Sequence, residues 1–261
     1  MSKAQQTTQN AELLNHIKQL MWQAGDAIME VYNSNEFDTE IKGDNSPVTK
    51  ADLAAHYTLI EGLAKLTPEI PVVSEEDSQS LDIPKTHSTF WLIDPLDGTK
   101  EFIKKNGEFT CNLALIENKQ PSLGFVGVPA KNTLYIGGKH TPSTCEQRNG
   151  QVKKIAHCKI DKTLTRVVAS KSHLNEETQA FIDAIGGNVE LVQAGSSLKF
   201  LKIATGEADI YPRLAPTCEW DTAAAQAVLE GAGGQVTQAT GEPMQYGKSE
   251  ILNPHFIAKA I

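Results

Sequence analysis

The sequence predicts a protein of two parts, an α+β part followed by a smaller α/β part. Two helical patterns come first, within residues 10–66. Short apolar runs typical of strands follow between residues 71 and 138, and strand-like and helix-like runs alternate after residue 163. Helices followed by consecutive strands indicate an α+β layer arrangement, whereas regular alternation indicates an α/β unit.

The first predicted elements are two amphipathic helices. Apolar residues recur at helical spacing over residues 10–33. A second helix is predicted from Thr49 to Leu66, because Thr49 suits an N-terminal cap and Pro68 lies just beyond the end. Asp52 completes a capping box with Thr49, so a capping role and a catalytic role both stay open for Asp52.

A meander-like sheet is predicted next. Its strand-like runs are separated by the turn-like segments 117–121 and 129–132. The runs are PVVS at 71–74, FWLID at 90–94, FTCNLALI at 109–116, SLGFVGV at 122–128 and TLYIGG at 133–138.

The second part is predicted to be a small α/β domain. The polar, weakly patterned segment 141–163 is the candidate boundary, and it divides the chain into domains of residues 1–155 and 156–261. The predicted strands are 166–170, 189–194, 208–212, 235–239 and 256–260, and the predicted helices are 175–185, 197–205 and 220–230.

Composition restricts the function classes. The net charge of −8 argues against a nucleic acid polymer as partner, because such binders neutralise phosphates with Lys and Arg clusters. The start of the sequence lacks the apolar core of a secretory signal, and no stretch approaches the roughly 20 apolar residues of a membrane span. We therefore expect a cytoplasmic protein without an integral membrane segment, and a peripheral association with the inner membrane stays open.

The stretch WLIDPLDGT at 91–99 ends an apolar run in two carboxylates. Asp94 is predicted to lie where the strand ends, because Pro95 restricts the preceding residue to extended backbone, and Gly98 then permits a sharp turn. Asp94 and Asp97 can therefore converge at one edge of the sheet. Each can also be a simple turn residue.

Further acidic residues follow the same pattern. Glu75 and Glu76 come directly after the PVV run, and Asp221 opens an Ala-rich helix. Neighbouring carboxylates repel unless a cation lies between them, and oxygen ligands without a His or Cys cluster favour Mg²⁺. Read alone, Glu75 and Glu76 fit a solvated loop and Asp221 fits the positive end of its helix, so only the combination indicates a metal site.

The order of these motifs resembles that of a known family. Asp52, SEED at 74–77, DPLDGT at 94–99 and EWDTAA at 219–224 match, in order, the pattern of the inositol monophosphatase superfamily of Mg²⁺-dependent, lithium-sensitive phosphomonoesterases. The segments DGTKEFI, GEFT, SKSH, GSSLKF and YPR resemble its CysQ-type 3′(2′),5′-bisphosphate nucleotidases. The resemblance implies a layered α/β/α/β/α sandwich, with an antiparallel sheet domain before a smaller α/β domain.

The resemblance also implies site residues and two or three Mg²⁺ ions. Glu75, Asp94 and the Leu96 carbonyl would hold one ion, and Asp94, Asp97 and Asp221 a second. Asp52, Glu75 and Thr99 would orient the attacking water and accept its proton. The expected substrate contacts are Glu75, Leu96, Asp97, Gly98, Thr99, His173, Gly195, Ser196, Lys199, Arg213 and Asp221.

The expected reaction is hydrolysis of adenosine 3′,5′-bisphosphate to AMP and phosphate by a water that Mg²⁺ activates. Hydrolysis of the 3′-phosphosulfate analogue, PAPS, to APS and a role in sulfur metabolism are further expectations from the resemblance. An inositol monophosphatase and a fructose-1,6-bisphosphatase of the same superfamily stay open as alternatives, as does a metal or nucleotide binding protein without turnover. We expect a small nucleotide substrate and a monomer or homodimer.

Overall fold

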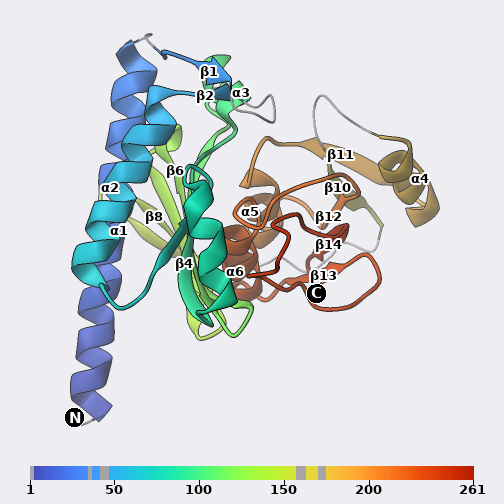
Figure 1. Ribbon diagram of the computed structural model, residues 1–261. Coiled ribbons are helices and arrows are strands. Elements are labelled where there is room, and N and C mark those ends of the chain that lie inside the picture. The colour runs from blue at the N-terminus through green and yellow to red at the C-terminus, as the bar shows by residue number, and fades with distance from the viewer. Residues whose placement is uncertain (1–2, 35–36, 42–46, 157–162, 170–174) are drawn as a thin grey trace.

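Five layers of secondary structure run across the molecule. The protein is described from a computed structural model, which covers residues 3–34, 37–41, 47–156, 163–169 and 175–261. From left to right in Figure 1 come a helix pair, a large sheet, two central helices, a second sheet and an outer helix. This is the α/β/α/β/α sandwich that the resemblance implies.

The outermost layer is formed by α1 (Lys3–Ser34) and α2 (Lys50–Leu66), which lie side by side (Figure 1). Their apolar faces include Leu20, Ala24 and Leu59, all buried in a core shared with the large sheet. The predicted helices are confirmed. The first begins earlier than residue 10, since residues 3–9 contain no proline or glycine that would stop it.

The large sheet has seven strands in sequence order. They are β3 (Val72–Ser74), β4 (Thr89–Asp97), β5 (Thr110–Glu117), β6 (Gln120–Val128), β7 (Thr133–Gly138), β8 (Thr141–Gln147) and β9 (Val152–Lys154). β3 and β4 pair in parallel and every later pair is antiparallel, as in the predicted meander. Short elements complete this part: β1 (Glu40–Ile41), β2 (Pro47–Val48), η1 (Ser78–Lys85), α3 (Thr99–Ile103) and η2 (Pro129–Lys131).

Two sequence predictions about this sheet are wrong in detail. Residues 141–154, interpreted as part of the weakly patterned boundary, contain β8 and β9. These strands form because each pairs with the preceding strand, although their sequences lack an apolar pattern. The strand with Asp94 does not end there. It continues to Asp97, and the pairing register with β5 shifts between these two residues, which accommodates Pro95.

The second sheet has the order β11-β10-β12-β14-β13. Its elements are β10 (Thr165–Ala169), α4 (Glu176–Ile185), β11 (Val189–Gln193), α5 (Leu198–Ala204), β12 (Ile210–Arg213), α6 (Ala223–Gly231), β13 (Gln235–Gln238) and β14 (Phe256–Lys259). β10 pairs in parallel with β11 and β12, and β14 is antiparallel to its neighbours. The predicted alternation is confirmed. The domain boundary at residue 155 stays a prediction.

Helix α6 lies directly on the large sheet and joins the two parts of the chain. A Cβ atom at Gly124 of β6 would lie 2.2 Å from the main-chain oxygen of Ala224, so only glycine permits this approach. The buried hydroxyl of Ser143 donates to the main-chain oxygen of Val228 at 2.6 Å. This packing holds the start of α6, and with it Asp221, beside the end of β4.

None of the helices in the described ranges is long and apolar enough to cross a membrane.

Candidate active site

Three carboxylates from distant segments meet at one point. Glu75 follows β3, Asp94 lies in β4 and Asp221 precedes α6, and one oxygen of each lies within 4.8 Å of the others. The Asp94 side chain is 1% exposed. Burial, and then the charges of Glu75, Asp97 and Asp221, raise the pKa of Asp94 well above its ordinary value. Burial and the charge of Asp97 likewise raise the pKa of Asp221 to about 8.

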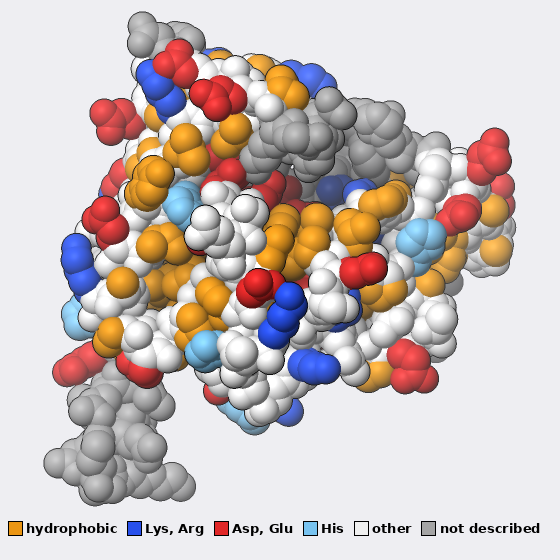
Figure 2. Space-filling view, viewed as in Figure 1, with side chains coloured by type: hydrophobic (Ala, Val, Ile, Leu, Met, Phe, Trp, Pro, Cys, Tyr) orange, Lys and Arg blue, Asp and Glu red, His pale blue; other side chains and the backbone are white. Residues whose placement is uncertain are grey.

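This cluster fits a divalent cation with oxygen ligands. Buried carboxylates at this spacing destabilise one another in their charged form, and a cation between them removes the repulsion. The ligand atoms are carboxylate oxygens, which hard cations such as Mg²⁺ prefer. The cluster can therefore hold a metal ion. Acidic side chains also gather in a hollow at the upper centre of the face shown in Figure 2, with basic side chains to one side.

The end of β4 turns the backbone toward the cluster. The Leu96 N–H donates to Asp94 Oδ1 at 3.1 Å, which orients that carboxylate. Gly98 follows with φ +95°, and a Cβ there would lie 3.2 Å from the Glu108 carbonyl oxygen. A left-handed glycine is therefore required at this turn, and helix α3 begins directly after it at Thr99.

Asp52 serves the cap of α2 and the site together. Its Oδ2 accepts from the Thr49 N–H and hydroxyl, both at 2.7 Å, in a capping box. Its Oδ1 accepts from the Thr99 hydroxyl at 3.2 Å. Asp52 is 1% exposed, so it is held in one orientation with its second oxygen facing Thr99. The two roles that the sequence left open do not exclude each other.

Asp97 lies beside the cluster and joins it to the second part of the chain. It is outside the group of three carboxylates, although its charge acts on Asp94 and Asp221. Its Oδ2 accepts from the Ser197 N–H at 2.7 Å, in the turn before α5. Residues from both parts of the chain therefore surround one site, as the order of motifs predicts.

The sequence and the site geometry agree with one known family. The model of the inositol monophosphatase family matches residues 9–260. The chain belongs to the inositol monophosphatase family. A relative from Escherichia coli O6:H1, the 3′(2′),5′-bisphosphate nucleotidase CysQ, is 45% identical over 249 residues, which cover 94% of this chain and 98% of the relative.

Solved structures have the same fold. The crystal structure of CysQ from Bacteroides thetaiotaomicron matches with a TM-score of 0.83 and 39% identity, over 96% of this chain and 97% of that one. The extragenic suppressor protein suhB from Bartonella henselae matches with a TM-score of 0.78 at 20% identity, over 95% of this chain and 94% of that one. The second likeness shows the fold alone.

In this inositol monophosphatase family member, a cavity of about 180 Å³ opens beside the carboxylates. Asp97 and Asp221 form part of its wall, and Lys199 and Arg213 form another part. Its other lining residues are Gly98, Glu101, Gly195, Ser196, Phe200, Tyr211, Thr217 and Thr222. Acidic and basic side chains thus face the same small space.

The two basic side chains that line this cavity, Lys199 and Arg213, each donate a hydrogen bond to a main-chain oxygen. Lys199 is 8% exposed, and its ammonium donates to the Ser196 carbonyl oxygen at 2.9 Å and lies 5.6 Å from the centre of the Tyr211 ring. Arg213 donates to the Pro216 carbonyl oxygen at 2.8 Å. Its Nε is buried and finds no hydrogen-bond partner among the described residues. The predicted contact His173 lies outside the described residues.

Sequence reasoning did not predict three polar contacts to Asp97. Thr110, Asn112 and Ser197 contact Asp97, and Ser197 also contacts the main chain of Asp221. Asn112 carries a usable signal, since it is a polar residue inside the apolar run of a buried strand. Nothing near Ser197 in the sequence distinguishes it from an ordinary helix cap.

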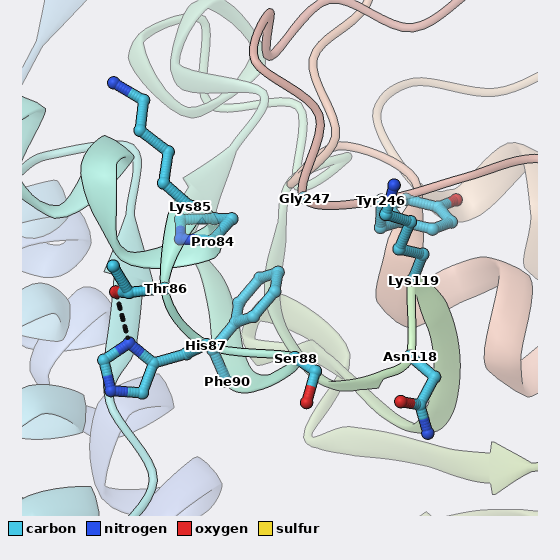
Figure 3. Close-up of a pocket in the computed structure, with 10 residues that line it drawn as sticks. All are labelled: Pro84, Lys85, Thr86, His87, Ser88, Phe90, Asn118, Lys119, Tyr246 and Gly247. Atoms are coloured by element: carbon cyan, nitrogen blue, oxygen red, sulfur yellow. Dashed lines mark hydrogen bonds between the residues drawn. The ribbon is translucent and has the colours of Figure 1, made fainter.

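A larger cavity lies away from the carboxylates. It measures about 470 Å³ beside Tyr246 and Phe90, and none of the predicted site residues lines it (Figure 3). The ammonium of Lys85 at its rim pairs with Asp82 at 2.6 Å. The described residues that the sequence predicts for the site lie at or near the carboxylate cluster and not at this cavity.

Proposed function

We propose that the protein is a Mg²⁺-dependent 3′(2′),5′-bisphosphate nucleotidase. It hydrolyses adenosine 3′,5′-bisphosphate to AMP and phosphate, and PAPS to APS, in sulfur metabolism. The observation that carries this proposal is the cavity whose wall holds Asp97 and Asp221 on one part and Lys199 and Arg213 on another. The name of the CysQ relative at 45% identity supports the same reaction.

The arrangement of charges favours a substrate with two phosphates. A phosphate beside the carboxylates needs divalent cations, because it would otherwise be repelled. A second phosphate can bind directly to Lys199 and Arg213, and the free Nε of Arg213 is a donor for it. An inositol monophosphate has no second phosphate to place against these two basic side chains.

The residues Glu75, Asp94, Asp97 and Asp221, with the Leu96 carbonyl, would hold two or three Mg²⁺ ions. When bound, Mg²⁺ supplies a water of lowered pKa as the nucleophile and neutralises charge on the leaving ribose oxygen. Residues of the chain then accept the proton that the attacking water loses. Glu75 accepts it directly, or Thr99 accepts it while its own hydroxyl proton moves to Asp52, whose Oδ1 lies 3.2 Å from Thr99 Oγ1.

The remaining contacts would orient the substrate. Main-chain N–H groups of Gly98 and Thr99 would donate to oxygens of the phosphate that is cleaved. Gly195 and Ser196 would lie against the nucleotide, and His173 stays a predicted contact. A Cβ at Gly195 would lie 3.0 Å from the Glu108 carbonyl oxygen, so glycine suits the close packing of this turn against Glu108.

We place this activity in the cytoplasm, in a monomer or homodimer. Cys111 and Cys145 are free thiols, which suits a reducing compartment. A peripheral association with the inner membrane is the remaining alternative for the location.

A phosphate-release assay tests the proposed function. Adenosine 3′,5′-bisphosphate, 3′-AMP, inositol monophosphate and fructose 1,6-bisphosphate are compared with and without Mg²⁺ and Li⁺. We expect Mg²⁺-dependent, Li⁺-inhibited release with the highest kcat/KM for the adenosine bisphosphate. Equal or faster turnover of inositol monophosphate or fructose 1,6-bisphosphate would favour the alternatives, and no release from any of them would indicate a binding protein.

One variant and its control test whether Lys199 recognises the second phosphate. Lys199→Ala should lower the preference for the bisphosphate over 3′-AMP about tenfold or more, since a hydrogen bond to a charged group contributes about 1.5–3 kcal/mol. Lys202→Ala is the matched control, because Lys202 lies on the same helix and pairs with Glu207 outside the cavity. An unchanged preference in Lys199→Ala would contradict this assignment.

A further inference from the structure

Ser197 has no part in the proposed reaction, yet it forms hydrogen bonds with both Asp97 and Asp221. It precedes α5, is 1% exposed and does not line the cavity that Ser196 lines. Its N–H donates to Asp97 Oδ2 at 2.7 Å, and its hydroxyl donates to the main-chain oxygen of Asp221 at 2.8 Å. One residue therefore contacts a carboxylate from the large sheet and the turn that carries another.

Asn112 completes this contact from the large sheet. Its Nδ2 donates to Ser197 Oγ at 3.0 Å and lies 3.5 Å from Asp97 Oδ2. Asn112 is 1% exposed and pairs with Asp94 across the β4–β5 ladder. The Ser197 hydroxyl is therefore both donor and acceptor in a buried set of bonds, where water cannot easily replace a lost partner.

We propose that Ser197 is a positioning residue that couples divalent-cation binding to the contact between the two parts of the chain. Asp97 and Asp221 repel each other and come from segments far apart in the sequence. Mg²⁺ requires oxygens at nearly fixed positions. Through its two donated bonds, Ser197 sets the position of Asp221 relative to Asp97, so the cation site is complete only when the turn before α5 lies against Asp97 of β4 and Asn112 of β5. This inference rests on the proposed function for the identity of the bound ion.

The test variant is Ser197→Ala, which keeps the N–H bond to Asp97 and removes the hydroxyl. Mn²⁺ binding to the free protein is titrated by the electron paramagnetic resonance of unbound Mn²⁺, and Mg²⁺ activation is measured with adenosine 3′,5′-bisphosphate. We expect about a tenfold rise in the Mn²⁺ dissociation constant and in the Mg²⁺ concentration for half-activation, in the range for loss of a partner that orients a metal ligand. KM for the nucleotide at saturating Mg²⁺ should stay unchanged.

Ser143→Ala is the matched control. Ser143 is also fully buried, and its hydroxyl also joins the large sheet to a central helix, through the Val228 carbonyl oxygen, but it contacts none of the carboxylates. This variant should lower the unfolding temperature as much as Ser197→Ala does, with no change in Mn²⁺ affinity. Asn112→Ala should weaken Mn²⁺ binding in the same direction, and the double variant with Ser197→Ala should add little, because both substitutions interrupt one network.

The outcomes separate this inference from the proposed function. If the wild-type protein binds Mn²⁺ and hydrolyses the bisphosphate, but Ser197→Ala behaves like Ser143→Ala, the positioning role is overturned and the proposed function stands. If the wild-type protein binds Mn²⁺ without turnover, and Ser197→Ala still weakens binding, the proposed function fails and the positioning role stands.

Discussion

Asp94 is the most deeply buried of the three clustered carboxylates. Its carboxylate lies in the interior, its Oδ1 accepts from the Leu96 N–H, and its pKa is raised by burial and by three acidic neighbours. A protein would not retain such a group for stability alone, because an apolar or neutral side chain there would remove the repulsion. The charged Asp94 carboxylate therefore lowers the stability of the metal-free protein, and a bound cation would offset that loss.

Asp94→Asn should abolish phosphate release and leave the fold intact. Asparagine keeps an oxygen for the Leu96 N–H but removes one negative charge from the cluster, so the metal-free protein should unfold at a higher temperature than the wild type in EDTA. Phosphate release and thermal unfolding are measured together. Asp82→Asn, at an exposed pair with Lys85, is the control. Near-normal turnover of Asp94→Asn would contradict a role for Asp94 in holding the cation.

The start of helix α2 shows how one element can serve stability and chemistry together. Asp52 is the third residue of the helix, where its carboxylate reaches back to the Thr49 N–H and hydroxyl. That reach leaves Oδ1 directed at Thr99 in helix α3. Thus the cap that begins α2 also fixes the orientation of the proposed proton acceptor.

Thr49→Ala should therefore change stability and rate at once. Loss of the cap hydroxyl should lower the free energy of unfolding by about 1 kcal/mol. It should also lower kcat, because Asp52 loses one of the two donors that orient its Oδ2. Urea unfolding and kcat at saturating Mg²⁺ are the measurements. Thr49→Ser keeps the hydroxyl and should restore both, whereas a normal kcat in a destabilised Thr49→Ala would separate the cap from the site.

At the scale of the whole molecule, the fold brings acidic groups together at a cost that a cation offsets. The raised pKa of Asp221, about 8 against an ordinary 3.8, means that the folded chain binds its proton more tightly than the unfolded chain. Without metal, this contribution to stability is fully present below about pH 3.8 and is lost as the pH rises through about 8. Asp94 acts in the same direction.

Stabilisation by Mg²⁺ should consequently increase with pH. Mg²⁺ competes with protons for these carboxylates, so its affinity for the folded chain rises as they ionise. In thermal unfolding, the increase in midpoint temperature on adding Mg²⁺ should be larger at pH 8 than at pH 5.5. The effect should be lost in Asp94→Asn. An equal increase at both pH values would contradict the placement of the cation among Asp94 and Asp221.

Local patterns were sufficient for most elements. Helical periodicity predicted α2 from Thr49 to Leu66, because it marks the face of a helix that is buried. Short apolar runs between turn-like segments predicted the strands from Val72 to Gly138, because strands such as β4 are buried on both faces. The ordered acidic motifs identified the family. Patterning did not predict the continuation of β4 through Pro95, nor β8 and β9, because pairing with neighbouring strands and not local apolar spacing forms them.

By itself, the sequence determined the fold class and named the three carboxylates that the structure brings together, since each depends on short motifs or on periodicity within one segment. Only the tertiary structure decided that Asp52 caps α2 and also accepts from Thr99, and that Asn112 and Ser197 join Asp97 to Asp221. Those contacts are hydrogen bonds between segments far apart in the chain. Their partners are set by the packing of α2 and α6 on the large sheet and by the place of the turn before α5, which no single segment encodes.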